Sequence, residues 1–293
     1  MSFLVATIAA AGRHTASAPL ARRPAAAAAW LLLAAPAFGA GAEAPAADIP
    51  RTADGKPDFS GIWESMSGAD YDLEPHAGRE DAPPGRGVVH GDFIPYQPWA
   101  LEQRRKNFEA RATADRTRLQ CLTLGVPRSV YYPAPLQIFQ RPRDLTIVNP
   151  FGAVRTIHTN GTSHPEGPFG FWLGDSRGHW EGDTLVVDVV DFNDETWLDR
   201  AGNFHSDALH VVERWTLLDA NTIRYEATLE DSKVYTRPWT LSVILYRHRE
   251  ENFQLIENYC YTHAYDEHYP FEGADRLPPA ESDVAREREV NEP

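Results

Sequence analysis

The stretch ALHVVERWTLLDANTIRYEATLE, residues 208–230, decides the fold. Two runs rich in β-branched and aromatic residues flank the turn signal DAN, a pattern that predicts a β-hairpin. Successive side chains of a strand point to opposite faces. The mostly apolar positions form the predicted inner face, which contains Leu209, Val211, Glu213, Trp215 and Leu217 in the first run and Ile223, Tyr225, Ala227 and Leu229 in the second. The opposite face of the first run starts with His210 and is polar.

Runs of the same kind recur along the chain. The further predicted strands lie within residues 58–65, 136–141, 144–149, 153–159, 178–192, 238–248 and 253–263. About ten strands joined mostly by tight turns predict an all-β fold, an antiparallel β-barrel of about eight to ten strands, because closure removes exposed strand edges. A helix with Pro98 in its first turn is predicted inside an insertion of helix and loop at 66–133. Residues 121–135 are predicted to be irregular.

The N-terminal sequence has the order of an export signal. Arginines precede an apolar run from Ala25 to Leu33, and small residues follow. We expect a signal peptide at 1–42, a disordered segment at 43–57, a single barrel domain at 58–268 and an acidic tail at 269–293. The apolar run is short for a membrane span, so we expect no stable membrane insertion. The predicted location is the periplasm or the exterior, reached by a Sec-type rather than a twin-arginine signal.

Charge and missing motifs narrow the class of partner. The formal net charge is −14, which argues against nucleic acid, because phosphate binding requires a basic face. The sequence has no Gly-x-Ser-x-Gly elbow, no phosphate loop and no Gly-x-Gly-x-x-Gly motif. We therefore predict a small-molecule ligand and no cofactor. The sequence leaves the oligomeric state open.

The chain has two cysteines, Cys121 and Cys260. In an oxidising compartment an even number of cysteines permits a disulfide, here one that joins the early chain to the last predicted strand. The chain-entropy model gives such a long loop a stabilisation of about 4–5 kcal/mol. The alternative is two buried free thiols.

Two resemblances add to this interpretation. FSGIWE, residues 59–64, resembles the Gly-x-Trp signature on the first strand of lipocalins, where the Trp closes the narrow end of the barrel. The stretches at 155–165, 178–199, 205–215 and 235–240 resemble a group of exported bacterial proteins of unassigned function. This second resemblance covers most of the chain from Asp54 to about Cys260. It implies a lipocalin-like or calycin-like barrel, and it brings no assigned reaction. Similar proteins often carry aspartate where this chain has Asn160, so no catalytic acid is expected there.

Ionisable side chains concentrate near one predicted end of the barrel. Glu213 is expected to face an apolar interior beside Trp215, where desolvation would raise its pKa and suit it to acid–base chemistry. A histidine at the barrel mouth would be its partner. The predicted catalytic residues are Glu213, His205, His210 and His164. The alternative for Glu213 is an ion pair with an arginine such as Arg155 or Arg224.

The histidines also have simpler interpretations. On a polar outer face, His210 would pair with Asp188 or Glu226 across neighbouring strands. His164 lies before a proline in a loop and would then be an ordinary turn histidine. A metal ion would need a ligand such as His158 or His164 in addition to His205 and His210. The spacing matches no zinc motif, so no metal is predicted.

Aromatic and polar residues on the strands and in the connection at 191–207 are the expected ligand contacts. They are Trp197, Asp194, Asp199, Arg155, His158, Trp215, Tyr225, Glu257 and Tyr259. A tryptophan among carboxylates suits stacking on a sugar or aromatic ring, although a loop folded on its own tryptophan has the same composition.

Three functions fit these observations. The first is an exported barrel enzyme that binds a small aromatic, terpenoid or sugar-like molecule. It would act by His/carboxylate acid–base chemistry, as a lyase, isomerase, cyclase or hydrolase. The second is a non-enzymatic carrier or sensor of lipocalin type. The third is an enzyme that depends on a histidine-bound metal.

Overall fold

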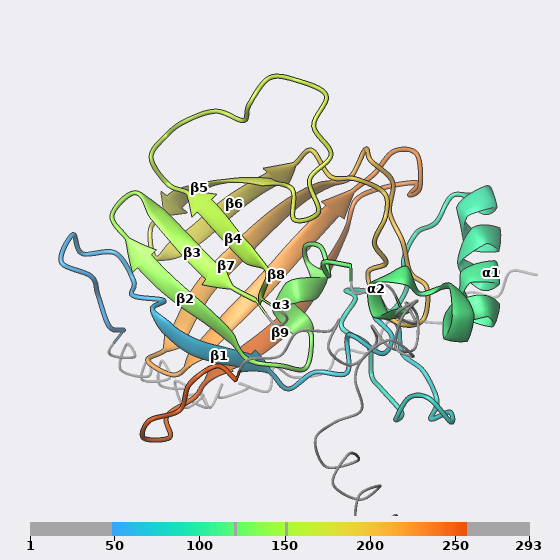
Figure 1. Cartoon of the computed structure of the whole chain (residues 1–293), viewed down its shortest axis with the longest axis horizontal. Coiled ribbons are helices and arrows are strands. Elements are labelled where there is room, and N and C mark those ends of the chain that lie inside the picture. Colours follow the sequence, from blue (N-terminus) through green and yellow to red (C-terminus); the bar gives the residue numbers. More distant parts are fainter. Residues whose placement is uncertain (1–48, 120–121, 150–151, 257–293) are drawn as a thin grey trace, which may run out of the picture. The chain divides into compact units, whose positions relative to one another are not determined.

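The computed structural model describes residues 49–119, 122–149 and 152–256, and these form a closed barrel of nine strands (Figure 1). The described residues all belong to one unit, Pro45–Pro293. The strands are β1 (Gly61–Ser65), β2 (Leu136–Arg141), β3 (Asp144–Val148), β4 (Val154–His158), β5 (Asp175–Glu181), β6 (Thr184–Val190), β7 (His210–Asp219), β8 (Thr222–Glu230) and β9 (Trp239–Arg247). Each strand pairs with the next in sequence, and β9 returns to pair with β1. The predicted barrel is therefore confirmed.

One strand pair differs from the antiparallel arrangement that we predicted. β4 and β5 run parallel, with Ile157 beside Ser176. The pairing joins the last two residues of β4 to Ser176 and Arg177 near the start of β5. Residues 159–174 connect these two strand ends as a long loop that projects beyond the strands, and we call them the crossover loop (Figure 1). All other neighbouring pairs are antiparallel, so the barrel is mixed.

The prediction of a strand at 253–263 is wrong for its first four residues. Residues 253–256 have no strand structure, and Ile256 is 84 % exposed. Residues 257–263 lie outside the described part of the chain.

The predicted alternation along the central hairpin is confirmed. Buried and more exposed side chains alternate along β7 and β8, with Glu213 and Tyr225 inward and His210 outward. The inward residues join those of the other strands in one core, which includes Trp63 and Ile157. Burial of this apolar surface is the main force that stabilises the barrel.

One end of the barrel, which we call the closed end, contains the turns between β5 and β6 and between β7 and β8. There Trp63 is fully buried under the guanidinium of Arg247, 4.1 Å from the ring centroid. Arg247 also donates to the carbonyls of Ser60 and Ala220, so it ties β9 to the start of β1 and to the β7–β8 turn. Gly61 permits this approach, because a Cβ there would lie 2.2 Å from Arg247 Nη1.

The opposite end, which we call the rim, is where β6 ends and where β5 and β7 begin.

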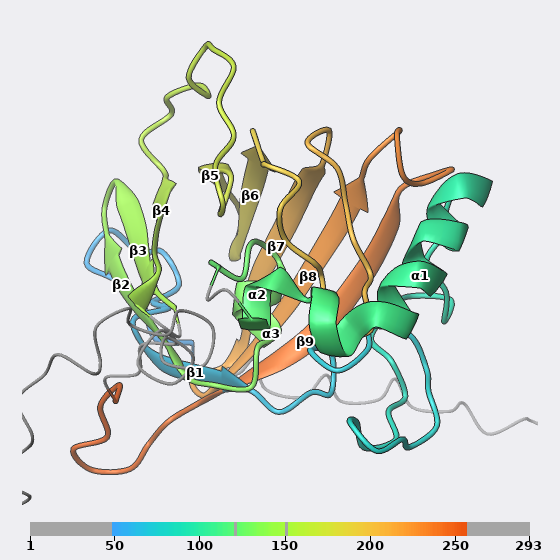
Figure 2. The same ribbon diagram turned by 45° about the vertical axis from the view of Figure 1, so that its right-hand side comes forward.

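Three helices lie between β1 and β2 in sequence: α1 (Pro98–Ala114), α2 (Arg116–Leu119) and α3 (Arg128–Tyr131). Both views place α3 against the strands and α1 farthest from them (Figure 2). α1 starts at Pro98, as predicted, because proline fits the first helical turn. The expectation of an irregular segment at 121–135 is corrected by α3, whose four side chains are buried.

Among the described helices, none combines the length and the apolar character that a membrane crossing requires.

Candidate functional site

A chain of ionisable side chains crosses the outer face of the barrel wall near the rim. His210 begins β7, and its Nε2 lies 2.5 Å from Oδ1 of Asp188 on β6. His164 of the crossover loop places Nε2 2.9 Å from the other oxygen of Asp188 and Nδ1 2.6 Å from Asp175 on β5. Arg177 donates to both oxygens of Asp175. We call these five residues the rim cluster.

The strand register explains how these residues meet. Arg177 on β5 is paired with Asp188 on β6, and Asp188 is paired with Val212 on β7. His210 precedes Val212 by two positions, so it lies on the same outer face and diagonal to Asp188. The crossover loop then brings His164 over this face. Three neighbouring strands and one loop thus contribute to a single polar patch.

The two carboxylates of the rim cluster are held in their ionised form. Burial would raise the pKa of Asp188, but hydrogen bonds from His210 and His164 outweigh burial and bring its pKa below the ordinary value. Burial acts in the same way on Asp175, and hydrogen bonds from Arg177 and His164 lower its pKa. Both ring nitrogens of His164 face carboxylates, so its imidazole bridges Asp175 and Asp188. Basic and acidic side chains therefore alternate from Arg177 to His210.

His210 is the open end of this chain. Its side chain is 39 % exposed, and Nε2 donates to Asp188. No hydrogen bond joins Nδ1 of His210 to another residue in the part of the chain that the structure describes. A carboxylate that holds one imidazole nitrogen fixes the tautomer and leaves the lone pair of the other nitrogen available as a base. This arrangement is suited to accept a proton from a molecule at the surface.

A second ion pair lies on the other side of the same wall. Glu213 is fully buried, and its two oxygens accept hydrogen bonds from Nη1 and Nη2 of Arg155 at 2.9 and 2.5 Å. The hydroxyl of Tyr225 donates to Oε1 at 2.7 Å, and Nε of Arg155 donates to Ser176 at 3.0 Å. We call these four residues the inner cluster. Trp215 packs edge-on against Tyr225, with ring centroids 4.7 Å apart.

The inner cluster has the ion pair that the sequence left as the alternative for Glu213. The partner is Arg155, while Arg224 points outward on β8. Burial raises the pKa of Tyr225 well above its ordinary value, and the charge of Glu213 adds to this effect. The phenol therefore stays protonated and keeps donating to the carboxylate. A catalytic role for Glu213 would require this ion pair to open first.

His205 lies apart from both clusters. It is buried, its Nδ1 donates to the carbonyl of Ser206, and its Nε2 accepts from the hydroxyl of Thr196 at 3.0 Å. Burial lowers the pKa of His205, although the carbonyl of Ser206 opposes this. The imidazole is therefore neutral and fully hydrogen-bonded. The expectation that His205 lies together with Glu213, His210 and His164 is thus corrected, since only His210 and His164 meet.

The other predicted ligand contacts are dispersed. His158 is partly buried at the end of β4, Asp194 is exposed, and Trp197 accepts a hydrogen bond from Arg128 through its backbone carbonyl. The remaining predicted residues lie outside the described part of the chain: Glu257, Tyr259, Cys121 and Cys260. The predicted disulfide and signal peptide fall there as well and remain predictions.

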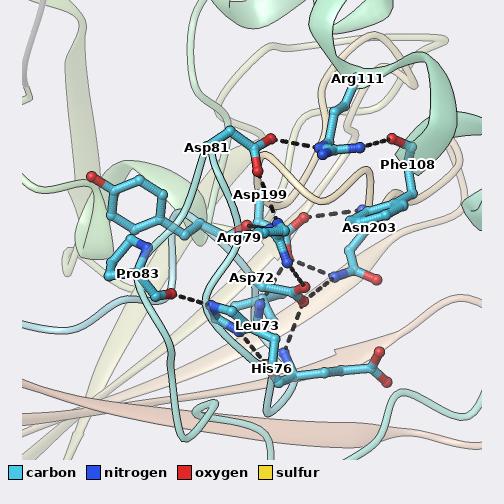
Figure 3. A network of polar contacts seen from close by, with 12 residues as sticks. Asp72, Leu73, His76, Arg79, Asp81, Pro83, Phe108, Arg111, Asp199 and Asn203 are labelled. Atoms are coloured by element: carbon cyan, nitrogen blue, oxygen red, sulfur yellow. Dashed lines mark hydrogen bonds and ion pairs between the residues drawn. The ribbon is translucent and has the colours of Figure 1, made fainter.

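Asp199 belongs to a buried network between two distant segments of the chain (Figure 3). It accepts hydrogen bonds from the backbone of Leu73 at 2.8 Å and from the side chain of Asn203 at 2.5 Å. The same amide also lies 3.5 Å from Asp72, which pairs with Arg79. Burial and the neighbouring charge of Asp72 raise the pKa of Asp199 to about 7. This aspartate therefore holds the connection at 191–209 to the segment before α1.

Within residues 49–119, 122–149 and 152–256, no group of three or more His, Cys, Asp or Glu side chains has an arrangement suited to a metal ion. His205 is separated from His210, and Glu213 lies on the opposite side of the wall.

Comparison of the chain with models of protein families, with curated proteins and with solved structures finds no match.

Three residues of the rim cluster were not predicted as site residues: Asp175, Arg177 and Asp188. Asp188 carried a usable signal, since it is the charged residue in the apolar strand TLVVDVV and alternation places it outward. Asp175 and Arg177 lie two apart on one strand, which puts them on one face. The sequence did not indicate the path of the crossover loop, and this path brings His164 to Asp175 and Asp188.

Proposed function

We propose that this protein is an exported barrel enzyme that acts on a small organic molecule by acid–base chemistry at the rim cluster. One observation carries the proposal: His210 is oriented by Asp188 and presents a free Nδ1 at an exposed position. The inner cluster offers no comparable group, because each of its charged atoms already has a partner.

In this mechanism His210 takes a proton from the substrate through Nδ1. The resulting imidazolium is stabilised by the carboxylate of Asp188, 2.5 Å from Nε2. His164 and Asp175 keep Asp188 in place through the second carboxylate oxygen. His210 can return the proton at another atom of the substrate in an isomerase, or to the leaving group in a lyase. In a hydrolase it would take the proton from the attacking water and pass it to the leaving group. A positioned acid–base residue contributes typically 10²–10⁴-fold to a rate.

An aromatic pair near the rim cluster supports an aromatic or other ring-shaped substrate. Phe169 and Phe171 of the crossover loop stack with ring centroids 5.3 Å apart, and they are 43 % and 39 % exposed. The backbone of Phe171 is anchored to Asp191, directly after β6, by a 2.8 Å hydrogen bond. β6 is also the strand that carries Asp188. Two exposed stacked rings beside ionisable groups form a surface suited to a flat apolar ligand.

We also propose that the barrel is lipocalin-like. The Trp of the Gly-x-Trp sequence, Trp63, is buried at the closed end, as the resemblance implies. Arg247 of β9 lies over the ring of Trp63 of β1, so this contact links the first strand to the last described strand. The parallel pair of β4 and β5 is the feature that departs from this architecture.

A turnover screen tests the proposed function. Purified wild-type protein is incubated with a panel of aromatic esters, glycosides and terpenoid alcohols, and products are identified by mass spectrometry. We expect one class to be converted, and His210→Gln to reduce the rate about 100-fold or more. His179→Gln is the matched control, because His179 lies on the same outer face with its Nε2 3.4 Å from Glu181. Binding without conversion would support the carrier instead, and equal rates in both variants would exclude His210 as the base.

A further inference from the structure

A groove on the far wall of the barrel, over β8 and β9, is separate from the rim cluster on β5, β6 and β7. It has a volume of about 300 Å³, at the lower limit of the roughly 300–1,000 Å³ typical of small-molecule sites. The groove is lined by Met66, Ser67, Val88, Arg224, Ser242, Val243, Ile244 and Tyr246. We call it the β8–β9 groove.

A gap along one edge of β9 creates this groove. β1 pairs with β9 from Leu245 to Arg247, and the segment around Val89 pairs with it at Leu241. Among the described residues, neither partner reaches Val243 or Ile244. The floor of the groove therefore includes strand backbone that the sheet leaves open.

The walls of the groove are apolar and exposed. Met66 is 77 % exposed and Tyr246 is 49 % exposed, and both contribute to the lining. Val88 and Ile244, which are partly buried, complete the apolar surface. Exposed apolar residues that line one hollow mark a ligand site more often than scattered ones do.

Arg224 gives the β8–β9 groove its positive charge. Its side chain lies on the outer face of β8, where Arg224 is paired with Ile244 of β9. Among the described residues, no hydrogen bond or ion pair joins its guanidinium to another side chain, in contrast to the nearby Arg214, which pairs with Glu181. Ser242 adds a hydroxyl, which is held by His90 Nε2 at 2.8 Å. A free guanidinium beside an apolar wall is complementary to a carboxylate with an apolar body.

We propose that the β8–β9 groove binds a small organic carboxylate, with Arg224 on the carboxylate and Met66, Ile244 and Tyr246 around the apolar body. This site is distinct from the proposed reaction site, so the two proposals fail or hold separately.

The experiment measures binding of benzoate to the whole protein by chemical-shift titration and calorimetry. Benzamide is the matched neutral probe, because it has nearly the same shape without the charge. We expect benzoate to bind and to shift signals of Val88, Ser242 and Ile244. Arg224→Gln should weaken benzoate binding about tenfold or more and leave benzamide binding unchanged, since only benzoate has a charge that pairs with the guanidinium.

Two variants complete the test. Arg249→Gln is the control for a general loss of positive charge, because Arg249 is exposed and does not line the groove. Met66→Ala should weaken benzoate by a few fold through loss of apolar contact. Equal affinity of benzoate and benzamide, or unchanged affinity in Arg224→Gln, would overturn the proposal. So would self-association that Arg224→Gln abolishes in a protein that binds no benzoate, because a second copy would then occupy the groove.

Discussion

The inner and rim clusters lie on opposite sides of one barrel wall and use neighbouring residues of the same strand. Glu213 and His210 are three residues apart on β7, yet one is fully buried and the other is 39 % exposed. On the inside, both carboxylate oxygens and the guanidinium of Arg155 are occupied by partners. On the outside, the chain from Arg177 through Asp188 ends at a histidine nitrogen without a described partner.

The two clusters should therefore differ in how much they stabilise the fold and in how easily they exchange protons. A buried ion pair is costly to break, because removing one partner leaves an uncompensated charge in a medium of low polarity. An exposed pair contributes little to stability, because water solvates either partner after the other is lost. The exposed pair can therefore exchange protons without unfolding the protein. The difference in burial therefore favours a structural role for the inner cluster and is consistent with the acid–base role that we propose for the rim cluster.

The largest expected effect comes from breaking the inner cluster. Glu213→Gln should lower the free energy of unfolding by about 3–5 kcal/mol, because Arg155 keeps its charge in the core. Urea denaturation of the purified variant measures this change. The double variant Arg155→Met/Glu213→Leu is the control, and it should recover most of the loss because neither charge remains. A loss below about 1 kcal/mol for Glu213→Gln would show that the pair is not structural.

Asp199 extends the comparison to a buried carboxylate that forms no ion pair with the described basic residues. Its pKa is about 7 in the folded protein and 3.8 ordinarily, so the folded state holds an extra proton between these values. Stability should therefore fall as pH rises from 4 to 7, by at most about 4 kcal/mol. Urea denaturation across this range measures the fall, which Asp199→Asn should flatten. Asp194→Asn, an exposed change in the same connection, should keep the wild-type slope. An equal slope in both variants would refute the assignment to Asp199.

A smaller effect is expected from the hydroxyl of Tyr225. Tyr225→Phe removes one hydrogen bond to Glu213 and leaves the contact with Arg155 intact. The free energy of unfolding should fall by about 1.5–3 kcal/mol, the range for a hydrogen bond to a charged group. Thermal and urea unfolding measure it. The loss should vanish when Phe is introduced into the double variant without the ion pair, and a persistent loss would point to packing instead.

The smallest effect on stability is expected in the rim cluster. Asp188→Asn removes a partner of two histidines, but the carboxylate side chain is 42 % exposed. The free energy of unfolding should change by less than about 1 kcal/mol at neutral pH. Urea denaturation beside Glu213→Gln makes the comparison direct. Equal losses in the two variants would contradict the division between structural and functional clusters.

The sequence predicted which side chains of the central strands point inward and outward. It did not predict which residues the long connections bring into contact. Alternation placed Glu213 inside and His210 outside, and it offered the pairing of His210 with Asp188. It could not show that β4 and β5 are parallel, because a parallel pair and a long hairpin look alike in a sequence. The position of His164 depends on that path.

Networks between distant segments were also missed. Asp72 and Asp199 lie far apart in the chain and meet through Asn203. Both occur in polar stretches that resemble solvated loops. Their burial depends on how the segment before α1 packs on the connection at 191–209, and no local pattern encodes that packing.

The most direct test of the central claim is the reaction of individual histidines with diethyl pyrocarbonate at neutral pH, followed by peptide mass spectrometry. His179 is 62 % exposed and His210 is 39 % exposed, so exposure alone predicts faster modification of His179. If Asp188 orients and activates His210, then His210 should react faster than His179, and Asp188→Asn should remove that advantage. Modification rates that follow exposure in both proteins would contradict an activated imidazole at the rim.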